Sequence, residues 1–500
     1  MEYINFLNCK FYFEIFTTLI NYPTLLVLIT FVWIIIFLFI SNHGSKTTKP
    51  SKLPPGPSPY SIIGNILNLG LYRNPLHSLT LLSKTYGPII TLKIGSITTI
   101  VISSPQIAKE ALCTKDKVFC NRVIPDTMRA LEHDKASIAW MPASSSKWRS
   151  FRRACATRVF SPQQLDSTRF HRQRKVQDLL DYVNECCKKD SDKCQSHHNK
   201  HIKEIICGIV EEMARPNVSD IFPFLRVFDI QGARASMTNH YAKLFAFFDG
   251  VIEGRMLLRT SDSSKKFNDV LDSLIDLIEE GSSQLSRHDI IHLFGDMFIG
   301  GLDTTSTILE WAMAELLHNP TKLVRVREEL QHKLVNFGQI VEESHASSKF
   351  PYLCAVLKET LRLHPPAPFL LPHKSNDDIE LAGFMIPKGA QVGVNVWSIG
   401  RDSSIWTNPD LFEPERFLEC DIDFKGKGGF ELIPFGAGRR ICPGLPLASR
   451  FMHFILASLL HHFDWKLPDD DLNQQDMNMD HKFEFTLCKA QSLRVIPIKV

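Results

Sequence analysis

The chain has 500 residues, of which 44% are hydrophobic and 22% charged, and a formal net charge of +3 at pH 7. This small charge excludes the strongly basic composition of nucleic-acid-binding proteins, so no nucleic-acid partner is expected. The 12 cysteines are scattered without a CxxC pair, which excludes a disulfide-rich scaffold and favours a reducing compartment.

The first predicted element is a membrane anchor over residues 1–41. Residues Thr24 to Ile40 (TLLVLITFVWIIIFLFI) contain no charge and no proline, and the length suits a bilayer-crossing helix. No small-residue cleavage site follows, which favours a retained anchor over a removed signal peptide. Three lysines lie between residues 46 and 52, so the positive-inside rule predicts a single-pass topology with the later residues in the cytosol. A buried core helix is the alternative interpretation.

A basic, proline-rich hinge is expected over residues 42–59, because Pro50 to Pro59 reads PSKLPPGPSP. One globular domain is expected over residues 60–500. Within it, Ile89 to Ile102 alternates around Gly95-Ser96 and predicts a β-hairpin. Phe119 to Lys147 predicts a long loop, and the pattern from Trp148 onward is mostly helical.

A polar stretch from Cys186 to His201 interrupts the helical pattern. It holds Cys194, His197 and His198 as well as His201, which are residue types that bind zinc. The spacing is irregular and the context is charged, so a solvated linker is the favoured interpretation.

Leu285 to Pro320 predicts the longest helix, with a capping box formed by Ser286 and Asp289. Its middle reads Gly-Gly-Leu-Asp-Thr-Thr from residue 300, and glycine and threonine are poor helix formers. The Thr304 hydroxyl is placed to bond the carbonyl of Gly300 and bend the helix. A packing notch for another helix and an opening for a ligand are both open interpretations.

A shorter helix is expected from Pro351 to Leu363, where Glu359 and Arg362 share a face. Taken alone, this pair is an ordinary salt bridge. Ile379 to Val396 alternates weakly and predicts strands.

The glycine-rich loop from Phe435 to Gly444 delivers Cys442 to the start of a long apolar helix. Cys442 is expected at the N-cap, with Pro443 at the first helical position. Free backbone N–H groups, the helix dipole and nearby Arg440 would then favour the thiolate. A thiolate held in this way is a metal ligand or a nucleophile; the second role needs a nearby base, and the loop contains no histidine.

Four separated patterns together resemble the cytochrome P-450 superfamily of haem-thiolate monooxygenases over essentially the whole chain. They are Phe435-x-x-Gly438-x-Arg440-x-Cys442-x-Gly444, Glu359-x-x-Arg362 with Arg416 of a Pro-Glu-Arg-Phe stretch, Gly300-Gly301-x-Asp303-Thr304-Thr305, and Trp148-x-x-x-Arg152. The proline-rich hinge, Leu361 to Pro366 and the cysteine loop look like plant microsomal enzymes. The group that includes geraniol and other monoterpenoid hydroxylases is the most similar.

The resemblance implies a mainly α fold with small β-sheets, in which a single large haem domain follows the anchor in the endoplasmic reticulum membrane. It implies haem b with an axial thiolate from Cys442, which binds the haem iron and favours O–O cleavage. No flavin or nicotinamide motif is present. NADPH would therefore act only indirectly, through a separate flavoprotein reductase, and the other expected partners are membrane lipid, O2 and a small apolar substrate.

The resemblance also assigns roles to individual residues. Asp303 and Thr304 would deliver protons to iron-bound oxygen, although a salt bridge is an alternative role for Asp303. The expected haem-binding residues are Trp148, Arg152, His373, Phe435, Arg440 and Cys442, and the expected structural triad is Glu359, Arg362 and Arg416. An apolar substrate pocket would draw on Phe298, Ile299, Gly300, Phe369, Leu370 and Phe485, for which plain core packing is the alternative.

One segment departs from the family pattern. Relatives have two helices and a loop between Tyr182 and Phe222, and this chain is short by about one helix near residues 186–205. Its loss would expose an apolar face. A haem-binding but catalytically impaired variant is therefore one alternative, and an aromatic, phenolic or alkaloid substrate is another. An oxygen-independent isomerase or dehydratase is opposed by the Asp303-Thr304 pair.

Overall fold

The computed structural model describes residues 27, 30–33, 53–70, 75–188, 200–261, 267, 269–281, 285–334, 341–343, 349–468 and 477–499. The chain divides into two compact units, Met1–Lys52 and Leu53–Val500. Among the described helices, none combines the length and the apolar character that crossing a membrane requires. Most of the predicted anchor lies outside the described residues, so the anchor stays a prediction.

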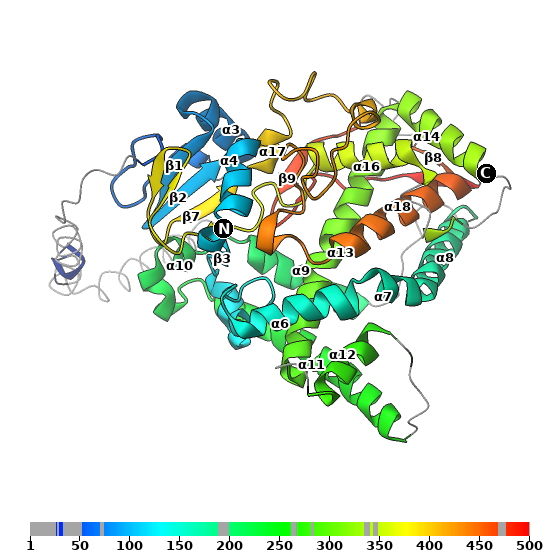
Figure 1. Ribbon diagram of the computed structural model, residues 1–500, viewed down its shortest axis with the longest axis horizontal. Helices are drawn as coiled ribbons and strands as arrows, with labels where there is room; N and C mark the ends of the chain where they lie inside the picture. The colour runs from blue at the N-terminus through cyan, green and yellow to red at the C-terminus, as the bar shows by residue number, and fades with distance from the viewer. Residues whose placement is uncertain are drawn as a thin grey trace, which may run out of the picture. The chain divides into compact units, whose positions relative to one another are not determined.

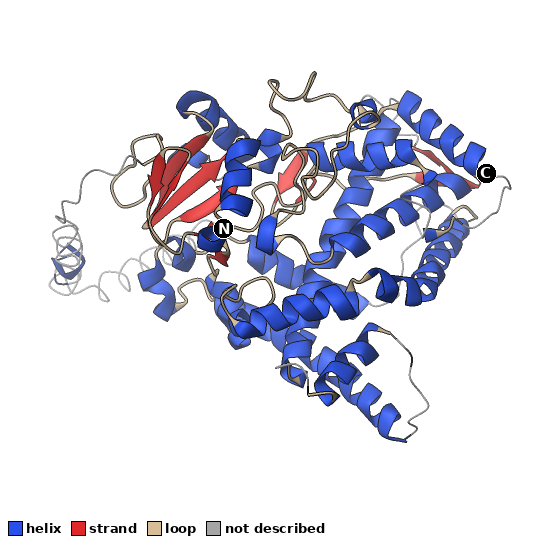
Figure 2. Cartoon of the chain, in the orientation of Figure 1, coloured by secondary structure: helices blue, strands red, loops and turns tan. Residues whose placement is uncertain are grey.

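The second unit is mainly helical with small sheets, as predicted (Figure 2). Its α-helices are α3 (Pro75–Tyr86), α4 (Pro105–Lys109), α5 (Asp116–Phe119), α6 (Ser146–Ala154), α7 (Pro162–Ser167), α8 (Arg169–Cys186), α9 (Lys200–Ala214), α10 (Val218–Ile221), α11 (Ala233–Ser261), α12 (Val270–Glu279), α13 (Arg287–His318), α14 (Pro320–Lys333), α16 (Pro351–Leu363), α17 (Val396–Ile399) and α18 (Leu445–His462). Its other helical turns are η1 (Leu67–Leu69), η2 (Glu110–Thr114), η3 (Asp126–Lys135), η4 (Cys155–Val159), η6 (Pro223–Phe228), η7 (Pro414–Phe417) and η8 (Gly438–Arg440).

In the described part of the chain, the largest sheet has the strand order β1-β2-β7-β4-β3, and three two-stranded sheets accompany it. The strands are β1 (Ile89–Ile94), β2 (Ile97–Ile102), β3 (Asn121–Arg122), β4 (His373–Lys374), β5 (Ile379–Leu381), β6 (Phe384–Ile386), β7 (Gln391–Val394), β8 (Phe463–Lys466), β9 (His481–Phe483), β10 (Leu487–Lys489) and β11 (Ile496–Lys499). Strands β1 and β2 pair antiparallel, which confirms the predicted hairpin, and β7 adds parallel to β2.

The helical part packs around α13, which Figure 1 shows running beside α18 and α16. One apolar core joins α13, α16, α18, α14 and α8, and a second joins α13 with α6, α9, α11 and α12. Since α13 contributes to both cores, it fixes the helices on either side of it.

Several local predictions are corrected. The predicted loop Phe119–Lys147 contains the helical turn η3. The last residues of the predicted hinge are part of the second unit, because the Pro55 carbonyl accepts a hydrogen bond from the Thr91 N–H at 2.9 Å. Cys186 is disulfide-bonded, which the scattered cysteine spacing did not predict. Cys194, His197 and His198 of the polar stretch lie outside the described residues, as does the His201 side chain.

Candidate functional site

A tight loop presents Cys442 at the start of α18. Gly438 has a φ of +66°, and a Cβ on it would lie 1.9 Å from the Leu112 carbonyl oxygen, so no larger residue fits there. The Cys442 N–H donates to the Phe435 carbonyl at 2.9 Å and closes the loop. The Phe435 ring itself packs against Phe424, at 5.7 Å between centroids. Glycine geometry and one backbone bond therefore fix the position of the sulfur.

The environment of the sulfur contains the predicted N–H groups but differs in detail. Helix α18 begins at Leu445 with Gly444 as its N-cap, so Cys442 precedes the cap instead of occupying it. Burial raises the pKa of the Cys442 thiol, while the N–H groups of Gly444 and Leu445 and the Arg152 charge lower it. The prediction that the Cys442 pKa is lowered is thus wrong for the protein without a bound metal, because desolvation of the sulfur is the largest effect. A metal ion at the sulfur would supply the missing positive charge.

A cluster of cations lies beside the loop. The Arg440 guanidinium stacks over Trp148 at 4.6 Å and donates to Ile138 O at 3.1 Å. Arg152 donates to Ile441 O at 2.9 Å and lies 5.8 Å from the Trp148 ring centroid. The Trp148 indole N–H donates to Ile138 O at 2.9 Å. The structure thus brings together three of the predicted haem-binding residues.

His373 and Arg122 complete this cluster. They are paired residues of β4 and β3, and both are buried. His373 Nδ1 lies 2.6 Å from the Phe119 carbonyl, and burial together with the Arg122 charge holds the pKa of His373 well below its ordinary value. Sequence reasoning missed Arg122, because a single arginine in an expected loop carries no periodic signal and only the strand pairing places it here.

The cations of this cluster lack a negative partner. Burial lowers the pKa of Arg122 to about 9 and that of Arg440 to about 10. In the described parts of the chain, no salt bridge joins Arg122, Arg152 or Arg440 to a carboxylate, and the Arg122 Nε has no hydrogen-bond partner. Buried arginines ordinarily pair with an anion. The residues therefore fit the two propionates of a haem whose iron binds Cys442.

The middle of α13 is open where its ends are buried. A Cβ at Gly300 or Gly301 would meet nothing within 4 Å. The Thr304 hydroxyl donates to the Gly300 carbonyl at 2.8 Å, as predicted. Asp303 accepts a 2.6 Å bond from the Thr486 hydroxyl, so its partner is a C-terminal loop and not the basic residue that a salt bridge requires. Sequence reasoning singled out neither this role of Thr486 nor the loop contact.

The predicted substrate-pocket residues fall into different places. Ile299 is buried one residue before Gly300, whereas Phe298 is 42% exposed and packs its ring 5.0 Å from Phe248. Phe369 meets the Phe483 ring edge-on at 5.6 Å. Leu370 has a φ of +53° and contacts the Gly436 position of the cysteine loop, and Phe485 lies in the turn between β9 and β10.

Asp296 is a further residue that sequence reasoning missed. It lies one turn before Gly300 and accepts bonds from the Ser137 hydroxyl at 2.8 Å and the Ile138 N–H at 2.7 Å. Ile138 is also the residue whose carbonyl holds Trp148 and Arg440. Asp296 therefore ties α13 to the segment that positions the cationic cluster.

The predicted structural triad is assembled and buried. Glu359 accepts from Arg362 at 2.7 and 2.8 Å and from Arg416 Nε at 3.0 Å. Arg362 also donates to the carbonyls of Pro409 and Leu411, at 2.6 and 3.1 Å. The network therefore joins α16 to η7 and the segment before it.

Comparison with known proteins identifies the family. The family model described as cytochrome P450 matches residues 54–195 and 186–490, in two pieces that meet near the predicted missing helix. Cytochrome P450 76T24 from Catharanthus roseus is 43% identical over 500 aligned positions, which cover 95% of this chain and 98% of that protein. The alignment is 500 positions long but includes only 95% of this chain, so the relative carries residues that have no counterpart here.

Two other relatives have named activities. Geraniol 8-hydroxylase from Catharanthus roseus is 41% identical, with 91% of this chain and 95% of that protein covered. Ferruginol synthase from Salvia miltiorrhiza is 41% identical, with 89% and 94% covered. A solved zebrafish cytochrome P450 with progesterone has a TM-score of 0.68 and 25% identity, and covers 85% of this chain and 99% of that one.

Proposed function

Because this chain belongs to the cytochrome P450 family, we propose that it is a monooxygenase that hydroxylates a small apolar terpenoid. The observation that carries the proposal is Cys442, set among backbone N–H groups beside unpaired cations. Geraniol 8-hydroxylase and ferruginol synthase, at 41% identity, support the terpenoid class. An aromatic, phenolic or alkaloid substrate remains the alternative for the same chemistry.

The chain's own residues divide the work. The family's cofactor is haem b with a cysteine thiolate ligand, which when bound supplies oxygen activation. Cys442 would hold the iron, and the cluster of Trp148, Arg152 and Arg440 would hold the propionates. The Thr304 hydroxyl lies at the open middle of α13, where it would hold a water molecule as the proton donor. Asp303, which accepts the bond from Thr486, would pass protons to that water.

Electron supply and location are further parts of the proposal. We infer that NADPH reduces the protein through a separate flavoprotein reductase and that residues 1–41 anchor it in the endoplasmic reticulum membrane, with the catalytic domain in the cytosol. The apolar run Thr24–Ile40 supports the anchor. In fractionated cells, the full chain should stay with the membranes after carbonate washing, and a chain lacking residues 1–41 should not.

The decisive experiment records the Soret band of the reduced protein with carbon monoxide. A thiolate-ligated haem gives a strongly red-shifted band, which should vanish in Cys442→Ala and persist in Cys488→Ser, a change at another free cysteine. Turnover of geraniol with NADPH and reductase then tests the substrate class. A folded protein without the shifted band would refute the proposal.

A haem-binding protein without turnover is the second candidate function. The family match divides near residues 186–195, and cytochrome P450 76T24 carries residues without a counterpart in this chain, which favours this candidate. This candidate predicts the shifted carbon monoxide band without product. Product formation from any substrate excludes it.

A further inference from the structure

A cavity of about 420 Å³ lies at the edge of the main sheet, and Cys442 is not among the residues that line it. Its walls come from the start of β2, the segment after β3, the turn before β7, and η6. Five cationic side chains line it: Arg122, Arg129, Arg226, Lys374 and Lys388. Of the residues that the structure describes, no aspartate or glutamate lines the cavity. We call it the basic cavity.

The charges of the basic cavity are poorly compensated. Arg129 pairs with Asp134 at 3.5 Å, and exposed Lys388 pairs with Asp377 at 3.4 Å. Among the residues that the structure describes, Arg122, Arg226 and Lys374 form no ion pair with a carboxylate within 4.0 Å. The Asp220 carboxylate interacts electrostatically with Arg226 and Arg129, but it forms no ion pair within 4.0 Å with either arginine.

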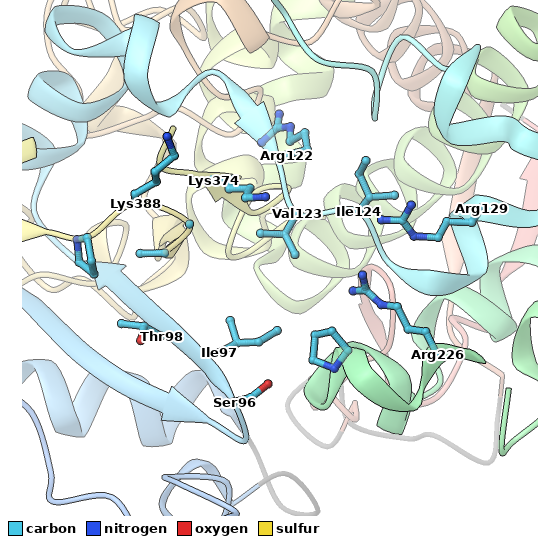
Figure 3. A pocket seen from close by; sticks show the side chains of 14 residues that line it. Ser96, Ile97, Thr98, Arg122, Val123, Ile124, Arg129, Arg226, Lys374 and Lys388 are labelled. Atoms are coloured by element: carbon cyan, nitrogen blue, oxygen red, sulfur yellow. The ribbon is translucent and has the colours of Figure 1, made fainter. Parts of the chain in front are cut away.

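The Arg129 guanidinium also retains an unused donor. Its Nε is buried without a hydrogen-bond partner, whereas the free Nε of Arg122 belongs to the cluster assigned to the haem propionates. A buried donor without a partner is costly, which favours an acceptor supplied by a ligand. Figure 3 shows Arg129 and Arg226 extending toward Ile124, with the Lys374 ammonium near Val123.

The remaining wall of the cavity is apolar. Ile97, Val123 and Ile124 lie between the cations (Figure 3). The same η6 turn that contributes Arg226 also exposes Phe224 by 55%, Val227 by 83% and Phe228 by 73%. Hydrocarbon and positive charge therefore adjoin, and the volume is within the usual range for small-molecule sites.

We propose that the basic cavity binds the anionic head group of an amphiphile, with its hydrocarbon part against Ile97, Val123 and Ile124. A carboxylate or phosphate accepts bonds from several guanidinium and ammonium groups at once. A neutral alcohol with the same skeleton would leave these donors unpaired. The head group could belong to a free terpenoid or fatty acid or to an anionic phospholipid, and the two sources share this chemistry.

Equilibrium dialysis with the full chain in neutral-lipid nanodiscs tests the proposal. Geranic acid and geraniol are the probes, since they share a skeleton and differ at the head group. Geranic acid should bind at least ~10-fold more tightly than geraniol, because charged hydrogen bonds add to its affinity. The advantage should shrink as salt is raised. Equal affinities would overturn the proposal.

Variants connect the effect to the cavity. Arg226→Gln and Lys374→Gln should each weaken geranic acid binding severalfold and leave geraniol binding unchanged. Lys466→Gln, at an exposed lysine on β8, is the matched control and should change neither. Unfolding midpoints identify any variant that fails to fold. Unchanged geranic acid binding in a folded double variant of Arg226 and Lys374 would overturn the proposal.

A second arm distinguishes the sources of the head group. Nanodiscs that contain phosphatidylserine should displace geranic acid if a lipid occupies the cavity, and should leave its binding intact if a free acid does. Dialysis does not depend on haem or turnover. A chain without the red-shifted carbon monoxide band that still prefers geranic acid would therefore refute the proposed monooxygenase while supporting this site.

Discussion

At the scale of single residues, opposing effects on one group decide its chemistry. Around Cys442, burial favours the neutral thiol, while two N–H groups and Arg152 favour the thiolate. The sequence motif revealed the donors but not the burial, which comes from helices distant in the chain. The same is true of Arg122, whose place depends on the pairing of β3 with β4.

The bond from Thr486 to Asp303 gives the first prediction. Thr486→Val removes the 2.6 Å bond and frees the Asp303 carboxylate to rotate, so proton delivery toward Thr304 becomes less ordered. We expect more peroxide and less product per NADPH, by several-fold, with the carbon monoxide band retained. Thr486→Ser keeps the hydroxyl and should stay coupled. Equal peroxide yields in the two variants would contradict this role.

A chain of three histidines, in which His133 and His292 are buried and His288 is exposed, gives a pH prediction. His292 Nδ1 lies 2.9 Å from His133 Nδ1, and its Nε2 lies 3.2 Å from His288 Nε2. Burial and then these two neighbours lower the pKa of His292 from 6.5 to about 3, with Lys147 acting in the same direction and Asp289 against it.

Below pH 6.5 the unfolded chain therefore binds a proton that folded His292 refuses, so stability falls as the pH falls from 6.5 toward 3. By pH 5 this group should remove about 2 kcal/mol from the free energy of unfolding. Urea unfolding at pH 7 and pH 5 measures the loss, which should shrink in His292→Gln. The exposed His332→Gln serves as the control and should leave the loss unchanged.

At the scale of elements, the sequence correctly predicted the features that interactions within a single segment determine. The hairpin of β1 and β2, the capping box of α13 and the extent of α16 all follow from patterns within one segment. The turn η3 was missed, because residues 130–132 inside it have non-helical backbone angles. Helix α18 begins later than predicted, because Gly444 is its N-cap.

The Glu359 network joins two such elements and carries a stability prediction. Glu359→Gln would leave the buried Arg362 and the mostly buried Arg416 without a full counter-charge. Breaking a buried pair in this way should lower the free energy of unfolding by about 3–5 kcal/mol, with loss of bound haem. Glu413→Gln, on the same Arg416 but 36% exposed, should remove less than about 1 kcal/mol. Similar losses in the two variants would contradict the assignment.

At the scale of the whole molecule, the region before α9 differs most from the relatives. Between Tyr182 and Phe222 the described helices are the end of α8, α9 and the single turn α10. The resemblance to the family suggested that this region is short by about one helix, and the split family match adds support. What the sequence could not show is which surface a missing helix would leave bare.

Helix geometry indicates that the uncovered surface is the face of α13 opposite Gly300 and Thr304. At about 100° per residue, Phe298 and Leu302 share a face roughly opposite Gly300 and Thr304. They are 42% and 50% exposed, although other apolar residues of α13, such as Leu293, are fully buried. An exposed apolar stripe in the middle of a core helix is the expected result of a missing neighbour.

The last prediction compares two leucines on this helix. Leu302→Ser should change the free energy of unfolding by less than about 0.5 kcal/mol and reduce binding of an apolar dye, because the side chain already meets water. Leu293→Ser, at a site that is 0% exposed, should remove at least about 3 kcal/mol. Equal losses would mean that something covers Leu302. Grafting the matching segment of cytochrome P450 76T24 between residues 188 and 200 should bury the stripe and make Leu302→Ser costly, whereas a glycine-serine linker of equal length should not.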